Sequence, residues 1–182
     1  MSSLLQPEVV VAKINRYFNI MIDIIFRYNG TINKFWGDAI MALWGLMSSE
    51  EDHTPQMSSV EASLDMHNAL FDFNYALIEE GQKPIQMGIG LNTGRFLAGN
   101  VGSEQQMEYT VIGDNVNLAS RIESLAARGQ IYISESTFER VKERIYAIKM
   151  NPTHVKGKEE AIQVYSVRGL RDREFSEKDY DR

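Results

Sequence analysis

Apolar positions recur at helical spacing in two long stretches of the chain. Over residues 7–27 they recur every three or four positions until Asn29-Gly30, and this spacing predicts a helix that ends there. A second helix is predicted to run to about Glu80, with the serine pair at 58–59 supplying its N-terminal cap. The predicted inner stripe of this second helix comprises Val60, Leu64, His67, Leu70, Phe71, Asn74 and Leu77.

Shorter apolar runs predict strands. The stretch Thr31–Gly45, TINKFWGDAIMALWG, is typical of a hairpin that turns at Gly37-Asp38, because glycine tolerates positive φ and aspartate bonds its own backbone. Residues 85–93 and 96–101 predict a second antiparallel pair, joined near Gly94. Further strands are predicted over 108–112, 131–133 and 162–167.

Two more helices are predicted where a polar cap precedes an apolar period. Asp114 is the expected cap of a helix over 115–127, whose inward face comprises Val116, Leu118, Ala119, Ile122 and Leu125. Asn117 and Arg121 are four positions apart in this helix and therefore share a face, a spacing that is also typical of a solvated surface. Ser134 is the expected cap of a short helix that ends near Lys142. Helices that alternate with antiparallel strand pairs predict an α+β fold.

Three glycines, at 88, 90 and 94, lie at a spacing that loosely resembles a dinucleotide-binding loop. Such a loop must open a helix, whereas an apolar β-like run follows these glycines. Glycine inside a strand indicates instead that another backbone approaches closely.

Composition narrows the possible functions. The chain has 182 residues, of which 43% are hydrophobic, and a net charge of −6, which indicates one globular domain without bulk attraction to nucleic acid or anionic membrane. The absence of cysteine excludes disulfides and thiolate metal sites and favours an intracellular origin. No apolar run reaches the ~20 residues that span a bilayer, and the first residues lack a secretory signal. His53 lies in an acidic, polar loop over 47–57 that is predicted to be solvated rather than metal-binding, since His53, His67 and His154 are far apart.

Three stretches carry a resemblance to a known family: NKFWGDAIMALWG, EYTVIGDNVNLASR and HVKGK, in this order. Together they closely resemble the catalytic domain of the class III nucleotidyl cyclases, from Pro7 to Val167. The resemblance implies a ferredoxin-like core, with a mostly antiparallel sheet and helices packed on it. It also implies a homodimer with active sites at the interface, and two Mg²⁺ or Mn²⁺ ions that assist attack of the ribose 3′-hydroxyl on the α-phosphate.

The resemblance assigns roles to individual residues. Asp38 matches a metal-binding aspartate, Lys34 matches the lysine that contacts the purine, and Thr110 matches the second base-reading position. Asn117 matches the residue that orients the ribose, and Arg121 matches the one that neutralises charge on the α-phosphate. Lys156 matches the lysine at the terminal phosphate, a role that Lys158 is also placed to share. Lysine at the first base-reading position favours ATP, because it donates to the N1 acceptor of adenine.

The chain departs from the family pattern in two places. The family begins with a strand that carries its first metal aspartate, and no equivalent precedes residues 1–10 here. Gly88 stands where some members carry a phosphate-binding arginine. These departures keep open a non-catalytic cyclase-homology domain that binds nucleotide or a partner, and a guanylyl cyclase is a further alternative.

The resulting prediction is an adenylyl cyclase catalytic domain over residues 1–168, with a polar tail over 169–182. It is expected to act in the cytoplasm on ATP, producing 3′,5′-cyclic AMP and pyrophosphate, behind an upstream sensor or regulatory domain. No nucleic-acid partner and no membrane insertion are expected.

Overall fold

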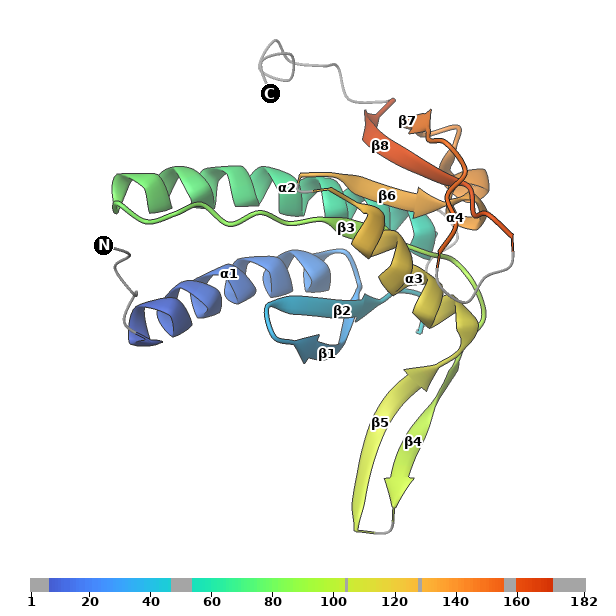
Figure 1. The fold of residues 1–182 in the computed structure, drawn as a ribbon, viewed down its shortest axis with the longest axis horizontal. Helices are drawn as coiled ribbons and strands as arrows, with labels where there is room; N and C mark the ends of the chain where they lie inside the picture. The colour runs from blue at the N-terminus through green and yellow to red at the C-terminus, as the bar shows by residue number, and fades with distance from the viewer. Residues whose placement is uncertain (1–6, 47–53, 104, 128, 156–159, 172–182) are drawn as a thin grey trace. The chain divides into compact units, whose positions relative to one another are not determined.

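The structure is a computed structural model that describes residues 7–46, 54–103, 105–127, 129–155 and 160–171. The chain divides into two compact units, Met1–Gln86 and Met87–Arg182. Figure 1 labels the helices and strands of both units. Within the described residues, no helix is both long enough and apolar enough to cross a membrane.

The first unit holds two helices and a hairpin. Its elements are α1 (Pro7–Arg27), β1 (Thr31–Trp36), β2 (Ala39–Leu43) and α2 (Pro55–Glu79). The predicted first helix and the hairpin are therefore confirmed. The facing sides of α1 and α2 bury Met21, Ile25, Val60 and Leu77, and burial of such side chains stabilises a fold by about 1.5–3 kcal/mol each.

The start of α2 differs from the prediction. Thr54 is the N-cap, and its side-chain oxygen accepts a hydrogen bond from the amide of Met57 at 3.3 Å. Pro55 follows at the first helical position, where a missing N–H costs nothing. Ser58 and Ser59, the expected caps, are buried inside the helix.

The predicted inner stripe of α2 is partly wrong. Phe71 is 48% exposed, whereas Phe73, two positions later, is buried and lies under the guanidinium of Arg16. The same guanidinium donates to both carboxylate oxygens of Glu80 at 2.8 and 2.9 Å, at the C-terminal end of α2. Gly81 then ends the helix with a φ of +71°, as its position predicts.

The described residues of the second unit form the other six strands and two helices. They are β3 (Ile89–Leu91), β4 (Leu97–Ser103), β5 (Gln106–Ile112), α3 (Asp114–Leu125), β6 (Ile131–Ser134), α4 (Glu135–Val141), β7 (Ile145–Lys149) and β8 (Val164–Leu170). Four strands form a sheet in the order β3-β6-β8-β7, in which β3 is parallel to β6 and the other neighbours are antiparallel. Ile122, Tyr132 and Val164 form a buried cluster in this unit.

The predicted antiparallel pair of 85–93 with 96–101 is wrong. β3 is only three residues long and pairs with β6, while β4 pairs with β5 from Leu97 opposite Ile112 to Ser103 opposite Gln106. β4 and β5 form the two-stranded arm drawn at the bottom of Figure 1. Both pairings satisfy the local β-propensity of the same runs, so local sequence alone does not choose between them.

The C-terminal half of this unit follows the prediction more closely. Ser134 caps α4, since its side-chain oxygen accepts from the amide of Thr137 at 3.3 Å. β7 was not predicted, and β8 continues to Leu170, past the expected start of the polar tail. The rest of that tail, from 172 onward, lies outside the described residues. The predicted α+β fold with mostly antiparallel strands is confirmed.

Candidate functional site

The first candidate region is the hairpin tip in unit 1. A two-residue loop, Gly37-Asp38, joins β1 to β2, and Gly37 has a φ of +61°. Glycine at the first position of such a loop lets the turn follow the twist of the strands. Asp38 is exposed at this tip.

A β-bulge in the same hairpin precedes Lys34. The register shifts between Ile32 and Lys34, which leaves Asn33 as the extra residue. Bulges turn the side chains that follow them. The ammonium of Lys34 lies 5.6 Å from the ring centroid of Trp36, and Lys34 is half-buried. The hairpin thus presents a cation and a carboxylate four positions apart.

Aromatic side chains of α1 lie near Asp38 and the hairpin. Tyr17 of α1 is buried, and burial raises the pKa of its hydroxyl to about 12, with the negative charge of Asp38 adding to the rise. Phe18 of α1 contacts Phe35 of β1, with ring centroids 5.0 Å apart. The hairpin is therefore fixed to α1 by ring packing, and Tyr17 remains a neutral hydrogen-bonding group at physiological pH.

The second candidate region is α3 in unit 2. Its N-cap is Gly113, at a φ of +154° and with no side-chain capping bond, so the expected cap Asp114 is instead the first helical residue. An acidic residue there is favourable, because its charge complements the positive end of the helix. Asn117 is exposed and Arg121 is half-buried, one turn apart on one face as their spacing predicts.

Three glycines hold the opposite face of α3. A Cβ added to Gly94 would lie 2.2 Å from the side chain of Asn115; one on Gly90 would lie 2.2 Å from the amide nitrogen of Glu123. One on Gly88 would lie 2.7 Å from the carbonyl oxygen of Ala126. The segment 88–94 therefore runs antiparallel along α3, with no room for a side chain at Gly88, Gly90 or Gly94. At Gly88 and Gly90 this is the close backbone approach predicted from these glycines.

The remaining predicted residues are placed as follows. Thr110 is half-buried in β5 opposite Gly99. Lys156 and its neighbour Lys158 lie outside the described residues, as does His53. The structure thus brings Lys34 together with Asp38 in unit 1, and Asn117 together with Arg121 in unit 2.

The described residues do not make a complete metal site. Among them, no group of three or more His, Asp or Glu side chains is arranged to hold an ion. The exposed carboxylate of Asp38 is a suitable oxygen ligand for Mg²⁺. A single carboxylate does not define a two-metal site.

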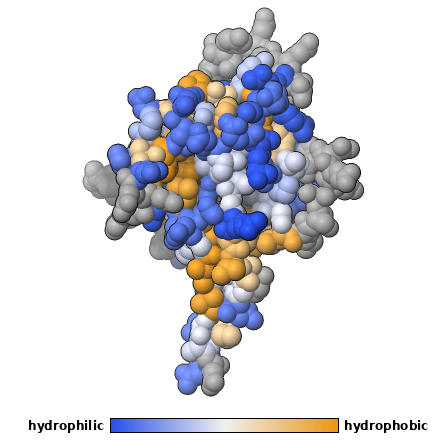
Figure 2. All heavy atoms as spheres, turned by 90° about the vertical axis from the view of Figure 1, so that its right-hand side faces the viewer, coloured by the Kyte–Doolittle hydropathy of each residue, from blue (hydrophilic) through white to orange (hydrophobic). Residues whose placement is uncertain are grey.

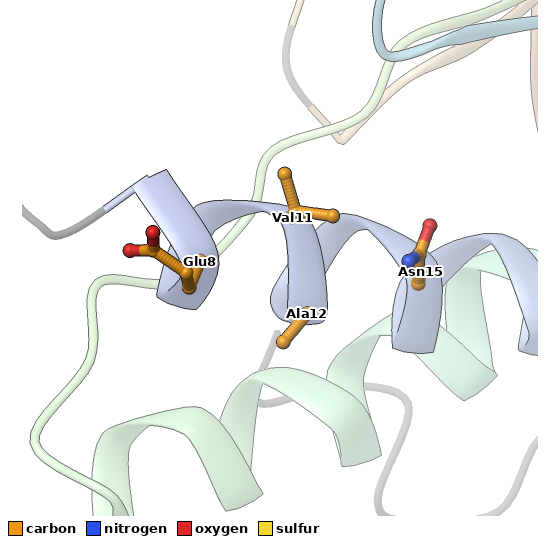
Figure 3. A pocket seen from close by; sticks show the side chains of 4 residues that line it. All are labelled: Glu8, Val11, Ala12 and Asn15. Atoms are coloured by element: carbon orange, nitrogen blue, oxygen red, sulfur yellow. The ribbon is translucent and has the colours of Figure 1, made fainter.

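One shallow, open hollow lies in unit 1, away from the candidate residues. It lies beside the N-terminal half of α1 and is lined by Glu8, Val11, Ala12 and Asn15, whose side chains Figure 3 shows. No candidate residue contributes to it. Its lining is largely apolar and carries no cation to attract a phosphate.

Sequence reasoning missed two polar side chains, Asn92 and Asn115, that join the candidate helix to the segment after β3. Asn92 follows β3 and donates to the backbone carbonyl of Asn115 at 2.9 Å, and Asn115 in turn donates to the carbonyl of Arg95 at 2.9 Å. The glycine spacing was the available signal, because it indicated that a backbone packs against 88–94. It did not indicate that the backbone was that of α3.

Comparison with known proteins identifies the family of the chain. The family model described as "Adenylate and Guanylate cyclase catalytic domain" matches residues 1–169. The chain therefore belongs to the family of adenylate and guanylate cyclase catalytic domains.

Similar proteins include cyclases named for both nucleotides. The chain is 37% identical to the guanylyl cyclase Cya2 (TM-score 0.85), over 94% of this chain and 86% of that one. It is 34% identical to the adenylyl cyclase CyaB from P. aeruginosa (TM-score 0.86), over 91% and 85%. The adenylate cyclase of Anabaena cylindrica is 33% identical over 92% of this chain and 34% of its own length. Adenylate cyclase 1 of Rhizobium meliloti (strain 1021) is 28% identical over 90% of this chain and 25% of its own length, so the chain spans about a third and a quarter of these two relatives.

Proposed function

We propose that this chain is an adenylyl cyclase catalytic domain, over residues 1–168, that converts ATP to 3′,5′-cyclic AMP and pyrophosphate. The observation that carries the proposal is the pair Asn117 and Arg121. They share one face of α3, while its opposite face is packed against glycine backbone. A helix fixed in this way presents an amide and a guanidinium at constant separation, which suits a ribose hydroxyl and the phosphate beside it.

Each residue has a chemical role in this proposal. Arg121 stabilises the charge that develops on the α-phosphate, because its planar guanidinium donates two parallel hydrogen bonds to phosphate oxygens. Asn117 orients the ribose, and Lys156 neutralises the terminal phosphate. Asp38 is proposed as one carboxylate ligand of Mg²⁺ or Mn²⁺, the ions that class III cyclases generally use.

Preference for ATP is assigned to Lys34 and Thr110. The ammonium of Lys34 donates only, so it pairs with N1 of adenine, which accepts, and not with N1–H of guanine. The bulge at Asn33 and the contact with Trp36 restrict the rotamers of Lys34. A restricted donor discriminates better between bases than a mobile one, because it cannot shift to reach an acceptor elsewhere on the wrong base.

Action as a homodimer is also proposed. Figure 2 shows apolar residues gathered on the arm formed by β4 and β5. Four large hydrophobic side chains among the described residues of this arm are exposed: Leu97, Val101, Met107 and Ile112. Leu97 is 79% exposed. A second copy of the chain that covers them would remove this apolar surface from water.

The test is a product assay on the purified chain with ATP or GTP, each with Mg²⁺ or Mn²⁺. We expect cyclic AMP as the main product, and Lys34→Glu is expected to lower the ATP-to-GTP ratio of kcat/KM by about 10-fold or more. Lys149→Glu, which makes the same charge change at an exposed position of β7, is the control. Cyclic GMP as the main product would favour the guanylyl alternative, to which the likeness to Cya2 points. Nucleotide binding without product would favour the non-catalytic alternative.

A further inference from the structure

A chain of side-chain hydrogen bonds attaches the N-terminal end of α3 to the loop after β3. The side-chain nitrogen of Asn92 donates to the backbone carbonyl of Asn115 at 2.9 Å. It also lies 3.4 Å from the side-chain oxygen of Asn115. The side-chain nitrogen of Asn115 donates to the carbonyl of Arg95 at 2.9 Å. The loop therefore donates a hydrogen bond to the helix, and the helix donates one to the loop.

The other side of Asn92 is attached to α4. Ser136 donates to the side-chain oxygen of Asn92 at 3.3 Å and to the carbonyl of Thr93 at 2.8 Å. The hydroxyl of Thr93 lies 2.9 Å from that of Thr137, which is buried. Asn92 therefore connects two helices, α3 and α4, through one side chain with all of its polar atoms in use.

The N-terminal end of α3 lacks a capping side chain of its own. Its N-cap is Gly113, which supplies no side-chain bond to the first turn. Gly94 contacts the side chain of Asn115 so closely that no Cβ fits between them. A helix end without a capping side chain frays unless tertiary contacts hold it, and the contacts that hold this one come from the loop 92–95.

Asn115 and Asn117 point in different directions. Two positions in an α-helix are about 200° apart around the axis, so Asn115 is turned toward the loop while Asn117 is turned away from it. A change in the bonds of Asn115 rotates or shifts the first turn of α3. Because Asn117 and Arg121 are on that turn and the next, their side chains move with it.

We propose that Asn92 is a positioning residue that fixes the rotation and height of α3, and thereby places Asn117 and Arg121 against the nucleotide. This inference rests on the proposed function of that pair. Asn92 does not itself contact the nucleotide in this proposal, and acts only through Asn115. Ser136 fixes the orientation of the Asn92 amide, so that its nitrogen faces α3 and its oxygen faces α4.

The test is Asn92→Asp, which replaces the amide nitrogen with an oxygen. It removes both contacts of that nitrogen with Asn115, and keeps an oxygen to accept from Ser136. We expect kcat to fall about 10- to 100-fold, the size of effect that a small misplacement of catalytic groups produces. The KM for ATP should change by less than about 3-fold, because ground-state contacts to the nucleotide are retained. Ser124→Ala is the control, since among the described residues the hydroxyl of Ser124 bonds to Ser120 and Glu123, both within α3.

A double-mutant cycle separates positioning from simple destabilisation. If Asn92 acts by placing Arg121, then Asn92→Asp should lower kcat by less than about 3-fold when Arg121 is already alanine, because residues that act as a unit are not additive. Equal effects of Asn92→Asp in the presence and absence of Arg121 would overturn the inference. A parallel fall in kcat and melting temperature, with Arg121 present or absent, would also overturn it.

A readout that needs no turnover keeps the inference distinct from the proposed function. Asn92→Asp should speed amide hydrogen exchange in the first turn of α3, at Val116 and Asn117, while leaving α4 protected. If the unmodified chain forms no cyclic nucleotide, the proposed function fails, and faster exchange still supports the attachment of α3 by Asn92. If the unmodified chain is active and Asn92→Asp changes neither kcat nor exchange, the inference fails and the proposed function stands.

Discussion

The hairpin in unit 1 and the helix α3 in unit 2 place their polar residues in different ways. The hairpin places Lys34 and Asp38 by local means: a two-residue turn, a bulge and ring packing against α1. The helix places Asn117 and Arg121 through contacts with a segment distant in sequence, where Gly88, Gly90 and Gly94 admit no side chain. A turn or a bulge can adjust when only a few atoms move. A helix whose backbone touches another backbone cannot adjust in this way.

The largest expected effect tests whether both regions serve one reaction. Arg121→Ala should lower kcat about 100- to 1000-fold, since removing one stabilising donor from a transition state costs this much. Asp38→Ala should abolish detectable turnover while leaving the oligomeric state unchanged, because Asp38 lies exposed at the hairpin tip. Cyclic nucleotide formation and light scattering measure the two properties.

Two exposed residues serve as controls for this prediction. Arg140→Ala in α4 and Asp23→Ala in α1 remove the same charges at exposed positions. Both should retain activity close to that of the unmodified chain. Retention of more than a tenth of the activity by Asp38→Ala would show that Asp38 is not an essential metal ligand.

The next effect tests the backbone contact itself. Gly90→Ala places a Cβ 2.2 Å from the amide nitrogen of Glu123, and overpacking of this kind costs about 1–3 kcal/mol of the free energy of unfolding. Gly99→Ala in β4 is the matched control: an added Cβ there meets nothing within 4 Å, and surface changes of this kind stay within about 0.5 kcal/mol. Urea unfolding measures both. Equal free energies of unfolding for Gly90→Ala and Gly99→Ala would show that α3 shifts to accommodate the added Cβ.

What the sequence could predict follows the same division. The turn at Gly37-Asp38, the cap at Ser134 and the Asn117–Arg121 spacing depend on neighbouring residues, and the structure contains all three. The pairing of β3 with β6 and the bond from Asn92 to Asn115 join segments far apart in the chain. No local pattern specifies which partner such a strand or side chain finds, and the wrong partner for 85–93 was predicted for this reason.

The glycines of 88–94 are an intermediate case. Their spacing predicted that some backbone approaches, because only glycine permits contact at this distance. Identifying that backbone as α3 required the structure. Gly88 illustrates the consequence: a Cβ there would lie 2.7 Å from the carbonyl oxygen of Ala126, so no arginine fits at 88 unless the end of α3 shifts.

A smaller effect tests how local the hairpin is. Gly37→Ala should lower the free energy of unfolding by about 1 kcal/mol, because a Cβ disfavours the positive φ of +61° at this position. Gly37→Asn should lose less, since asparagine adopts this conformation more readily than alanine does. No atom lies within 4 Å of an added Cβ at Gly37, so the cost is conformational. A loss as large as that of Gly90→Ala would mean that the hairpin also depends on distant contacts.

The smallest expected effect is a pH-dependent loss of stability in unit 1. His67 of α2 is half-buried, and its Nε2 atom has no hydrogen-bond partner among the described residues. Burial lowers the pKa of His67 below its usual 6.5. The unfolded chain therefore binds a proton near pH 6.5 before the folded chain does, so the stabilising contribution is present above this pH and is lost as the pH falls toward the folded-state pKa.

Acidification from pH 7.5 to 5.5 should thus weaken unit 1 more than unit 2. Amide hydrogen exchange in α2 should accelerate relative to exchange in α3, and His67→Gln should reduce this difference because glutamine does not titrate. His154→Gln, at an exposed position of unit 2, is the matched control and should preserve it. If acid accelerates exchange equally in α2 and α3, in the presence and absence of His67, then this histidine does not set the pH dependence. The contrast between the two units would then concern only how they place their polar residues.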